Sequence, residues 1–182
     1  LVRGLNFHLY GDYGLNVFNS RSLAYLKDKE LESACVSFEL RFAQIRDLKK
    51  VLRAEAIVYG RLPLMITENC LVQNETGCRL DRQGPCVPED GPCRCGQPNV
   101  LVDRTGAAFP LLPAYGHRTE IQNSKPLYLA DRPEHRRLGL AYARLRFTTE
   151  TAEECVSVVQ NYLDAAPAAG DFTRGLYERG VE

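Results

Sequence analysis

The stretch Ala56-Ile-Val-Tyr-Gly-Arg-Leu-Pro-Leu64 decides the fold, because it is an apolar run of strand length that follows a helical pattern. The helix is predicted from about residue 41 to residue 53, where apolar side chains recur on one face at Phe42, Ile45, Leu48 and Leu52. A shorter apolar strand, Ser33-Ala-Cys-Val-Ser-Phe38, precedes that helix. A strand–helix–strand order predicts two parallel strands joined by a right-handed crossover.

The same alternation extends in both directions from this stretch. Upstream, Leu5-Asn-Phe-His-Leu-Tyr10 predicts a strand, and Ser20 is the expected N-cap of a helix through Lys29. Downstream, a strand is predicted at 141–147. A helix at 152–165 follows it, capped by Thr149 or Thr151, with four side chains expected to face inward: Cys155, Val158, Val159 and Tyr162.

Four strand–helix units, the last of them after an insert, predict an α/β fold made of parallel (β/α) units. They would form about half of a TIM-type barrel, since such a barrel closes with eight units. The alternative is a small open, doubly wound sheet. No glycine-rich phosphate loop follows any predicted strand, which weakens the nucleotide-binding form of that alternative.

The insert is expected at about residues 67–130, within a single domain that covers residues 1–182. It begins with an irregular stretch, rich in Cys, Gly and Pro, that runs from Thr67 to Asn99. Short β-like segments follow at 100–103, 107–112, 120–121 and 127–130, and they favour a small antiparallel arrangement.

The bulk composition excludes several classes of protein. The chain has 182 residues with 23 basic and 23 acidic side chains, which argues against a dedicated polybasic surface. No apolar run reaches the length of a membrane span, and no export signal opens the chain. The seven cysteines are an odd number, so we expect a reducing cytoplasm rather than a disulfide-rich secreted protein.

The first residue is leucine and the only methionine is Met65, so we expect the chain to be a C-terminal fragment of a longer protein. Its first expected partner is therefore the missing N-terminal part of the same polypeptide. An open half-barrel would also expose two sheet edges and apolar surface, which makes self-association a second expectation.

Five cysteines lie close together after the deciding stretch, at Cys70, Cys78, Cys86, Cys93 and Cys95. Thiolates at this density serve metal binding, redox chemistry or disulfides, and all three uses stay open at this point. The preferred metal set is Cys70, Cys78, Cys93 and Cys95, with Cys86 as a substitute, for a 4Fe–4S cluster or for zinc. The spacing matches no standard zinc-finger or ferredoxin pattern. Cys35 and Cys155 lie in apolar surroundings and are expected to pack in the core.

Polar side chains fall at or just beyond the ends of predicted strands, where barrel active sites lie. They are Asp12, Asn16, Asn19, Glu39 and Arg61. Glu39 is the candidate general base, and Arg61 could hold an anionic substrate or a phosphate. The structural alternatives are that Asp12 and Asn16 stabilise a turn and that Glu39 pairs with Arg61. The charged run 132–137 predicts a solvated helix face or a contact with a nucleic-acid backbone.

Several of these segments also resemble a known family. The quoted stretches are Gly11-Asp-Tyr-Gly-Leu-Asn-Val-Phe-Asn-Ser20, Val36-Ser-Phe-Glu-Leu40, Tyr59-Gly-Arg-Leu-Pro-Leu-Met-Ile-Thr-Glu-Asn-Cys70, Asp103-Arg-Thr-Gly-Ala-Ala-Phe-Pro110, Asn123-Ser-Lys-Pro-Leu-Tyr128 and Phe172-Thr-Arg-Gly-Leu-Tyr177. They are similar to the collagenase-like peptidases of the U-32 group, in particular to the C-terminal barrel portion of its long bacterial members.

The resemblance implies a barrel-type fold and proteolysis, especially of collagen. It also implies an alternative chemistry, because other members are implicated in hydroxylating tRNA, ribosomal RNA or the ubiquinone precursor, with cysteine-bound iron–sulfur clusters. His117 becomes a further candidate ligand, since relatives tend to carry a cysteine at that position and imidazole can replace thiolate.

Three hypotheses therefore follow for the chain as part of an enzyme. It acts on peptides as a peptidase, it acts on RNA or a small molecule as a metal-cluster hydroxylase, or it is a non-catalytic structural or substrate-binding half. The sequence holds no His-Glu-x-x-His helix, no Gly-x-Ser-x-Gly elbow and no Walker loop, so no standard protease machinery is visible.

Overall fold

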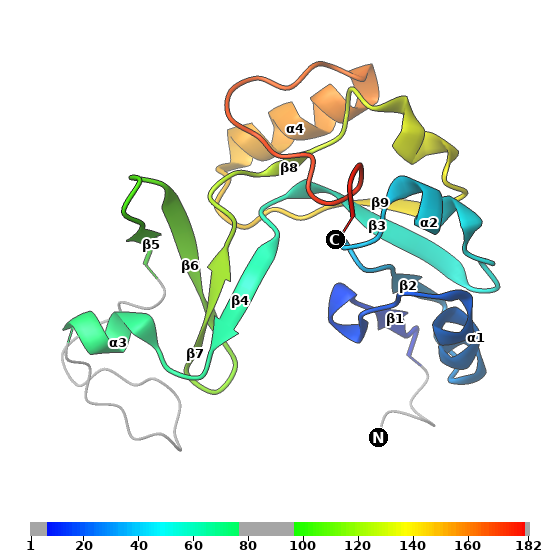
Figure 1. Cartoon of the computed structure of the whole chain (residues 1–182), viewed down its shortest axis with the longest axis horizontal. Coiled ribbons are helices and arrows are strands. Elements are labelled where there is room, and N and C mark those ends of the chain that lie inside the picture. The colour runs from blue at the N-terminus through cyan, green and yellow to red at the C-terminus, as the bar shows by residue number, and fades with distance from the viewer. Residues whose placement is uncertain (1–6, 77–96, 181–182) are drawn as a thin grey trace. The chain divides into compact units, whose positions relative to one another are not determined.

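The computed structural model describes residues 7–76 and 97–180 (Figure 1). The chain forms two compact units. Unit 1 consists of Leu1–Gly60 and Leu127–Glu182, and unit 2 consists of Arg61–Pro126. The chain thus leaves unit 1 after Gly60 and returns to it at Leu127, and these two residues are paired in register. Gly60 has φ of +118°, and a Cβ there would lie 2.0 Å from the carbonyl oxygen of Arg146, so glycine is required at this exit.

Unit 1 is built on a mixed sheet whose long strands are parallel. Its strands are β1 (Tyr10–Gly11), β2 (Ser33–Cys35), β3 (Arg53–Gly60), β8 (Leu127–Tyr128) and β9 (Tyr142–Leu145). Glu55 of β3 pairs with Cys35 on one side and with Tyr142 on the other, so β2 and β9 flank β3. The parallel strands therefore follow the order β1-β2-β3-β9. The short strand β8 runs antiparallel to β3.

This sheet confirms the mixed α/β class expected from the sequence. Within the described residues the parallel strands do not close into a barrel. One expected strand is placed differently from the prediction: residues 127–130 were assigned to the antiparallel insert, but Leu127 and Tyr128 form β8 in the sheet of unit 1. None of the helices among the described residues is long and apolar enough to cross a membrane.

The helices of unit 1 follow the capping signals only in part. The helix α1 (Ser20–Asp28) begins one residue earlier than expected, because Asn19 rather than Ser20 is its N-cap. The helix α2 (Phe42–Asp47) is much shorter than the expected 41–53 segment. Its end is fixed by Lys50, whose ammonium group donates to the carbonyl oxygens of Ile45 and Leu48, at 2.6 and 3.2 Å.

The last helix, α4 (Ala152–Asp164), begins where the sequence predicts it. Thr151 caps it in a capping box with Glu154. Val158 is buried as expected. The expectation that Val159 faces inward is wrong, because its side chain is 42% exposed. The short helices η1 (Tyr13–Leu15) and η3 (Pro133–Arg137) complete the helical segments described in unit 1.

Unit 2 is antiparallel, as the sequence predicts for the insert, but it spans Arg61–Pro126 rather than 67–130. The predicted strand 56–64 is divided, because β3 ends at Gly60 and residues 63 and 64 belong to the antiparallel sheet. Unit 2 contains β4 (Pro63–Thr67), α3 (Leu71–Thr76), β5 (Asn99–Val102), β6 (Ala108–Ala114) and β7 (Arg118–Gln122). The sheet order is β4-β7-β6-β5, and every pair is antiparallel. A small apolar core includes Cys70, Val72, Leu111 and Ile121.

Tyr177 ties the end of the chain to the sheet of unit 1. Its side chain is 1% exposed, its hydroxyl donates to the carbonyl oxygen of Ile57 at 2.6 Å, and its ring stacks on Phe42 at 5.3 Å between centroids. Burial raises the pKa of this hydroxyl, so it remains a donor at neutral pH.

We expect Tyr177→Phe to lower the free energy of unfolding by about 1–2 kcal/mol, because the ring packing is kept while one buried hydrogen bond is lost. Urea denaturation of the variant measures this loss. The matched control is Tyr25→Phe, since Tyr25 is 61% exposed in the same unit and should change stability very little. Equal stability of the Tyr177→Phe variant and the unmodified protein would contradict the structural role.

Candidate functional site

The sheet of unit 1 curves around one of its faces. Strands β1 and β9 are separated by β2 and β3, which in a flat sheet places them three spacings, or about 14 Å, apart. Arg144 of β9 nevertheless forms an ion pair with Asp12, which directly follows β1. The guanidinium carbon of Arg146 likewise lies 5.4 Å from the centroid of the Tyr13 ring. Both contacts cross the same face, which is therefore the concave one.

Strand register decides which side chains share this concave face, because paired residues of neighbouring parallel strands point to the same side. Cys35 pairs with Glu55, and Ile57 pairs with Arg144. The alternate positions are small and apolar: Ala34, Ala54, Ala56 and Ala143. The polar residues of these strands are thus collected on the concave side, and the small residues form the side on which helices can pack closely.

A charge cluster formed by Asp12, Glu55 and Arg144 spans the concave face. Arg144 donates to Asp12 through Nη1 and to Glu55 through Nη2. The side chain of Glu55 is 11% exposed, so its carboxylate depends on this guanidinium for compensation. Burial acts to lower the pKa of Arg144, but the neighbouring carboxylates outweigh burial and the pKa is raised. Arg144 therefore remains charged and holds the two carboxylates together.

Cys35 lies beneath this cluster and is completely buried. Burial raises the pKa of its thiol to about 12, and the positive charge of Arg144 offsets only part of that effect. Cys35 is therefore a neutral thiol at physiological pH, and it does not serve as a thiolate nucleophile. The expectation that Cys35 packs in the core is confirmed, whereas Cys155 is only partly buried.

A second group, which we call the rim cluster, lies just beyond the ends of β1, β2 and β9. It consists of Tyr13, Phe38, Glu39 and Arg146. The rings of Tyr13 and Phe38 are 6.0 Å apart, and Arg146 lies over the Tyr13 ring. Glu39 follows Phe38 directly and is partly exposed. Among the described residues of unit 1, no hydrogen bond or ion pair engages its carboxylate, which leaves that group available to a ligand.

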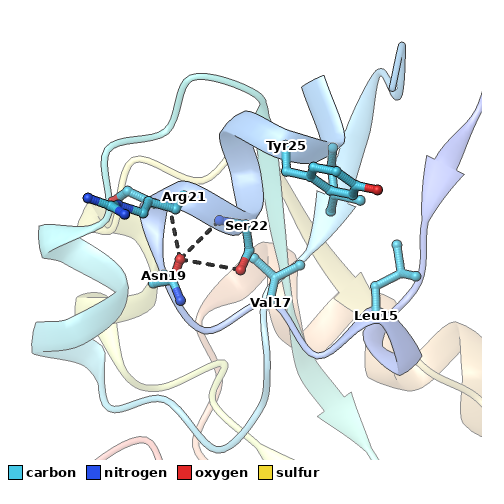
Figure 2. A pocket seen from close by; sticks show the side chains of 8 residues that line it. Leu15, Val17, Asn19, Arg21, Ser22 and Tyr25 are labelled. Atoms are coloured by element: carbon cyan, nitrogen blue, oxygen red, sulfur yellow. Dashed lines mark hydrogen bonds between the residues drawn. The ribbon is translucent and has the colours of Figure 1, made fainter. Parts of the chain in front are cut away.

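The other sequence candidates in unit 1 have backbone-capping roles. Asn16 has a left-handed backbone, with φ of 48°, and ends η1. The Oδ1 atom of Asn19 accepts from the backbone N–H groups of Arg21 and Ser22, at 3.0 and 2.9 Å (Figure 2). Asp12 caps η1 in addition to pairing with Arg144. These contacts account for the three residues structurally, and a catalytic role for Asn16 or Asn19 stays a prediction.

Arg61 belongs to unit 2. Its Nη1 atom donates to the carbonyl oxygen of Asn123 at 3.0 Å and also to that of Ser124. These bonds fasten the first residue of unit 2 to the segment that leads back toward unit 1. Its proposed role as an anchor for an anionic substrate stays a prediction.

Two of the candidate metal ligands, Cys70 and His117, lie in the described part of unit 2. Thr67 of β4 pairs with Thr119 of β7, so Cys70 and His117 lie close in sequence to the same end of this strand pair. The Oγ1 atom of Thr119 accepts from the backbone N–H of Leu71 at 3.1 Å, which fixes the start of α3 there. An ion pair between Glu68 and Arg118, at 3.0 Å, lies at the same end.

The remaining candidate ligands Cys78, Cys93 and Cys95, and the substitute Cys86, lie outside the described residues. Within residues 7–76 and 97–180, no group of three or more His, Cys, Asp or Glu side chains is arranged to hold a metal ion. Cys70 is 5% exposed. Cys70 packs in the small apolar core of unit 2, and its role as a metal ligand together with His117 stays a prediction.

The charged run 132–137 is exposed at residues 133, 134, 136 and 137, as expected for a solvated helix face. His135 is the exception, because it is buried, with 7% exposure. Its Nδ1 atom lies 2.5 Å from the carbonyl oxygen of Arg132, and burial lowers the pKa of the imidazole. A packed, largely neutral histidine explains this position.

Glu55, Arg144 and Arg146 are not among the site residues that the sequence predicts. A signal was present in the predicted strand 141–147, where arginines alternate with apolar residues. Charges at a spacing of two in a strand share one face of the sheet. A buried sheet tolerates such charges only where carboxylates or ligands meet them.

Comparison with known proteins gives one match. A family model described as peptidase family U32 matches residues 3–103, which is more than half of the chain. No curated protein and no solved structure matches significantly.

Proposed function

The chain belongs to peptidase family U32, and from this premise we propose that it carries the catalytic face of a peptidase acting on collagen-like peptides. The observation that carries the proposal is the Glu39 carboxylate, in the turn four residues after β2. It has no partner among the described residues of unit 1, and it directly follows Phe38, whose ring packs near Tyr13, the ring over which Arg146 lies. In barrel enzymes, reacting groups project from the carboxyl ends of the strands.

In this proposal Glu39 acts as the general base. Its carboxylate accepts a proton from a water molecule, whose oxygen adds to the carbonyl carbon of the scissile peptide bond. The guanidinium of Arg146 offers positive charge toward the oxyanion that develops. The C–N bond then breaks as protonated Glu39 returns the proton to the leaving amine. The hydrolysis of denatured collagen, and its loss in the Glu39→Gln variant, test this assignment.

We also propose that the parallel strands are consecutive strands of a TIM-type half-barrel. Two observations support this arrangement. The spatial order β1-β2-β3-β9 follows the chain without reversal, whereas a doubly wound sheet reverses its order at a switch point. The concave face is also curved enough for Arg144 to reach Asp12. The remaining strands would come from the N-terminal part of a longer polypeptide or from a second copy.

A second candidate function is supported by the cysteines of unit 2. An iron–sulfur cluster held by Cys70, His117 and the loop cysteines would supply electron transfer for hydroxylation of tRNA, ribosomal RNA or a ubiquinone-type precursor. A zinc ion held by the same residues would order the loop instead. Either group, and the reduced thiols themselves, suit the cytoplasmic location that we propose. A third candidate is a non-catalytic, substrate-binding half of the enzyme.

Metal analysis distinguishes these candidates. If the second function holds, the protein purified without oxygen contains iron and matching sulfide, with a broad absorption band near roughly 400 nm that is lost in Cys70→Ser. Cys155→Ser is the control, because this thiol lies on α4 in unit 1. Iron and sulfide retained in full by Cys70→Ser would contradict the ligand set, and a preparation without metal would favour the peptidase.

A further inference from the structure

Within residues 7–76 and 97–180, the two outer edges of the parallel sheet have no further parallel neighbour. Among the described residues, β1 pairs only with β2, and β9 pairs only with β3 among the parallel strands. Tyr10 on the first edge is 59% exposed, and Tyr142 on the last edge is 44% exposed. Four parallel strands in chain order are half the number with which a (β/α) barrel closes. A second identical sheet would therefore complete the set.

The helix α4 carries an apolar stripe that nothing in the described residues covers. Val156, Val159 and Leu163 recur at helical spacing and are 70%, 42% and 70% exposed. Such a stripe is normally buried against another helix. The charges of this helix are all negative, since it has Glu153, Glu154 and Asp164 but neither lysine nor arginine. A partner helix should therefore be basic.

The helix α1 meets this description at the other end of the sheet. Arg21, Lys27 and the C-cap residue Lys29 outnumber its single acidic residue, Asp28. A groove of about 780 Å³ runs along it, lined by Leu15 and Val17 of the preceding connection and by α1 itself (Figure 2). No residue of α2 lines this groove, and Leu15 and Tyr25 in it are 50% and 61% exposed.

We infer that two copies of this chain associate with two-fold symmetry, α4 of each copy lying in the groove beside α1 of the other. The outer helices of a (β/α) barrel run parallel to one another, so the N-terminal ends of the paired helices meet. This places Glu153 of one copy near Arg21 of the other. Asp164 then lies near Lys27 and Lys29 at the C-terminal ends.

Charge selects this pairing over the other two ways of joining the same helices. Two α4 helices would bring six carboxylates together without a cation, and two α1 helices would bring together two sets of excess positive charge. Only the pairing of α1 with α4 places acidic side chains opposite basic ones and the apolar stripe of α4 against the groove beside α1. The two-fold symmetry forms this contact twice and brings eight parallel strands together.

The first test is the mass of the chain in solution, measured by sedimentation equilibrium over a range of protein concentrations. We expect twice the 20.5 kDa of one chain, with dissociation on dilution. A single-chain mass at every concentration would overturn the inference. The sheet edges would then be expected to pair with strands from another part of a longer polypeptide.

The second test exchanges charges. Arg21→Glu and Glu153→Arg should each weaken association at least about tenfold, because each places like charges opposite one another. The double variant, in which the two charges are exchanged, should recover most of the affinity. Both side chains are exposed, so the fold is expected to persist, and urea unfolding of each variant checks this. If association persists in both single variants, or the double variant dissociates like them, this interface is excluded.

Discussion

The Arg144→Met variant is expected to lose about 3–5 kcal/mol of unfolding free energy, because it leaves a buried carboxylate without its cation. Arg144 is the only residue among those described that forms ion pairs with both Asp12 and Glu55. Asp12 is largely exposed and can be solvated, but Glu55 cannot, since its side chain is 11% exposed. Methionine fills a similar volume, so the loss reports charge rather than a cavity. Urea denaturation measures it.

Two further variants separate this effect from a general sensitivity to the loss of arginine. Arg46→Met removes an exposed pair with Asp47 and should change stability by less than about 1 kcal/mol. The double variant Arg144→Met with Glu55→Gln should be more stable than Arg144→Met alone, because the uncompensated charge is gone. A loss below about 1 kcal/mol in Arg144→Met would show that the cluster does not hold the concave face together.

The Glu39→Gln variant is expected to hydrolyse peptides at least about a hundredfold more slowly, because glutamine keeps the shape of the side chain but cannot accept a proton from water. The unfolding free energy should be unchanged within about 0.5 kcal/mol, since no described contact engages this carboxylate. The measurement is kcat/KM on a denatured collagen fragment, with urea denaturation of the same preparation.

The matched control for Glu39→Gln is Glu134→Gln, because Glu134 is an exposed glutamate of unit 1 that lies on η3. Its rate should equal that of the unmodified protein. If Glu39→Gln retains nearly full activity, the general base lies elsewhere, and the chain would be the substrate-binding half of the enzyme. If both variants lose activity equally, the loss reflects the charge of the unit rather than proton transfer.

The features that could be predicted from the sequence are those that depend on residues close together in the chain. Thr151 and Glu154 form a capping box three residues apart, and α4 begins where this pair predicts. The alternation of strands and helices predicted the parallel pairing of β1, β2 and β3, because a crossover helix requires it. Periodicity also predicted an inward Val159, which is wrong, because the stripe on α4 is wider than the surface it covers.

Contacts between residues that are far apart in the chain could not be predicted from the sequence. Helix α2 ends early because the ammonium group of Lys50 caps its carbonyl groups. Helix propensities of single residues do not predict such a contact. The pairing of β8 with β3 depends on where the chain returns after unit 2. Arg144 and Asp12 are 132 residues apart, and the pairing of β1, β2, β3 and β9 in one sheet brings them together. Residues of the candidate site that depend on such contacts could not be found without the fold.

The most direct test of the proposed peptidase is hydrolysis of denatured collagen by the protein after iron and zinc have been removed with a chelator. Glu39 and Arg146 lie in unit 1, apart in sequence from the cysteines of unit 2, so we expect the metal-free protein to continue releasing new amino termini. The same preparation of Glu39→Gln should release none above background. Absence of hydrolysis both before and after metal removal, together with iron and sulfide bound at Cys70, would contradict the account and establish the metal-cluster function in its place.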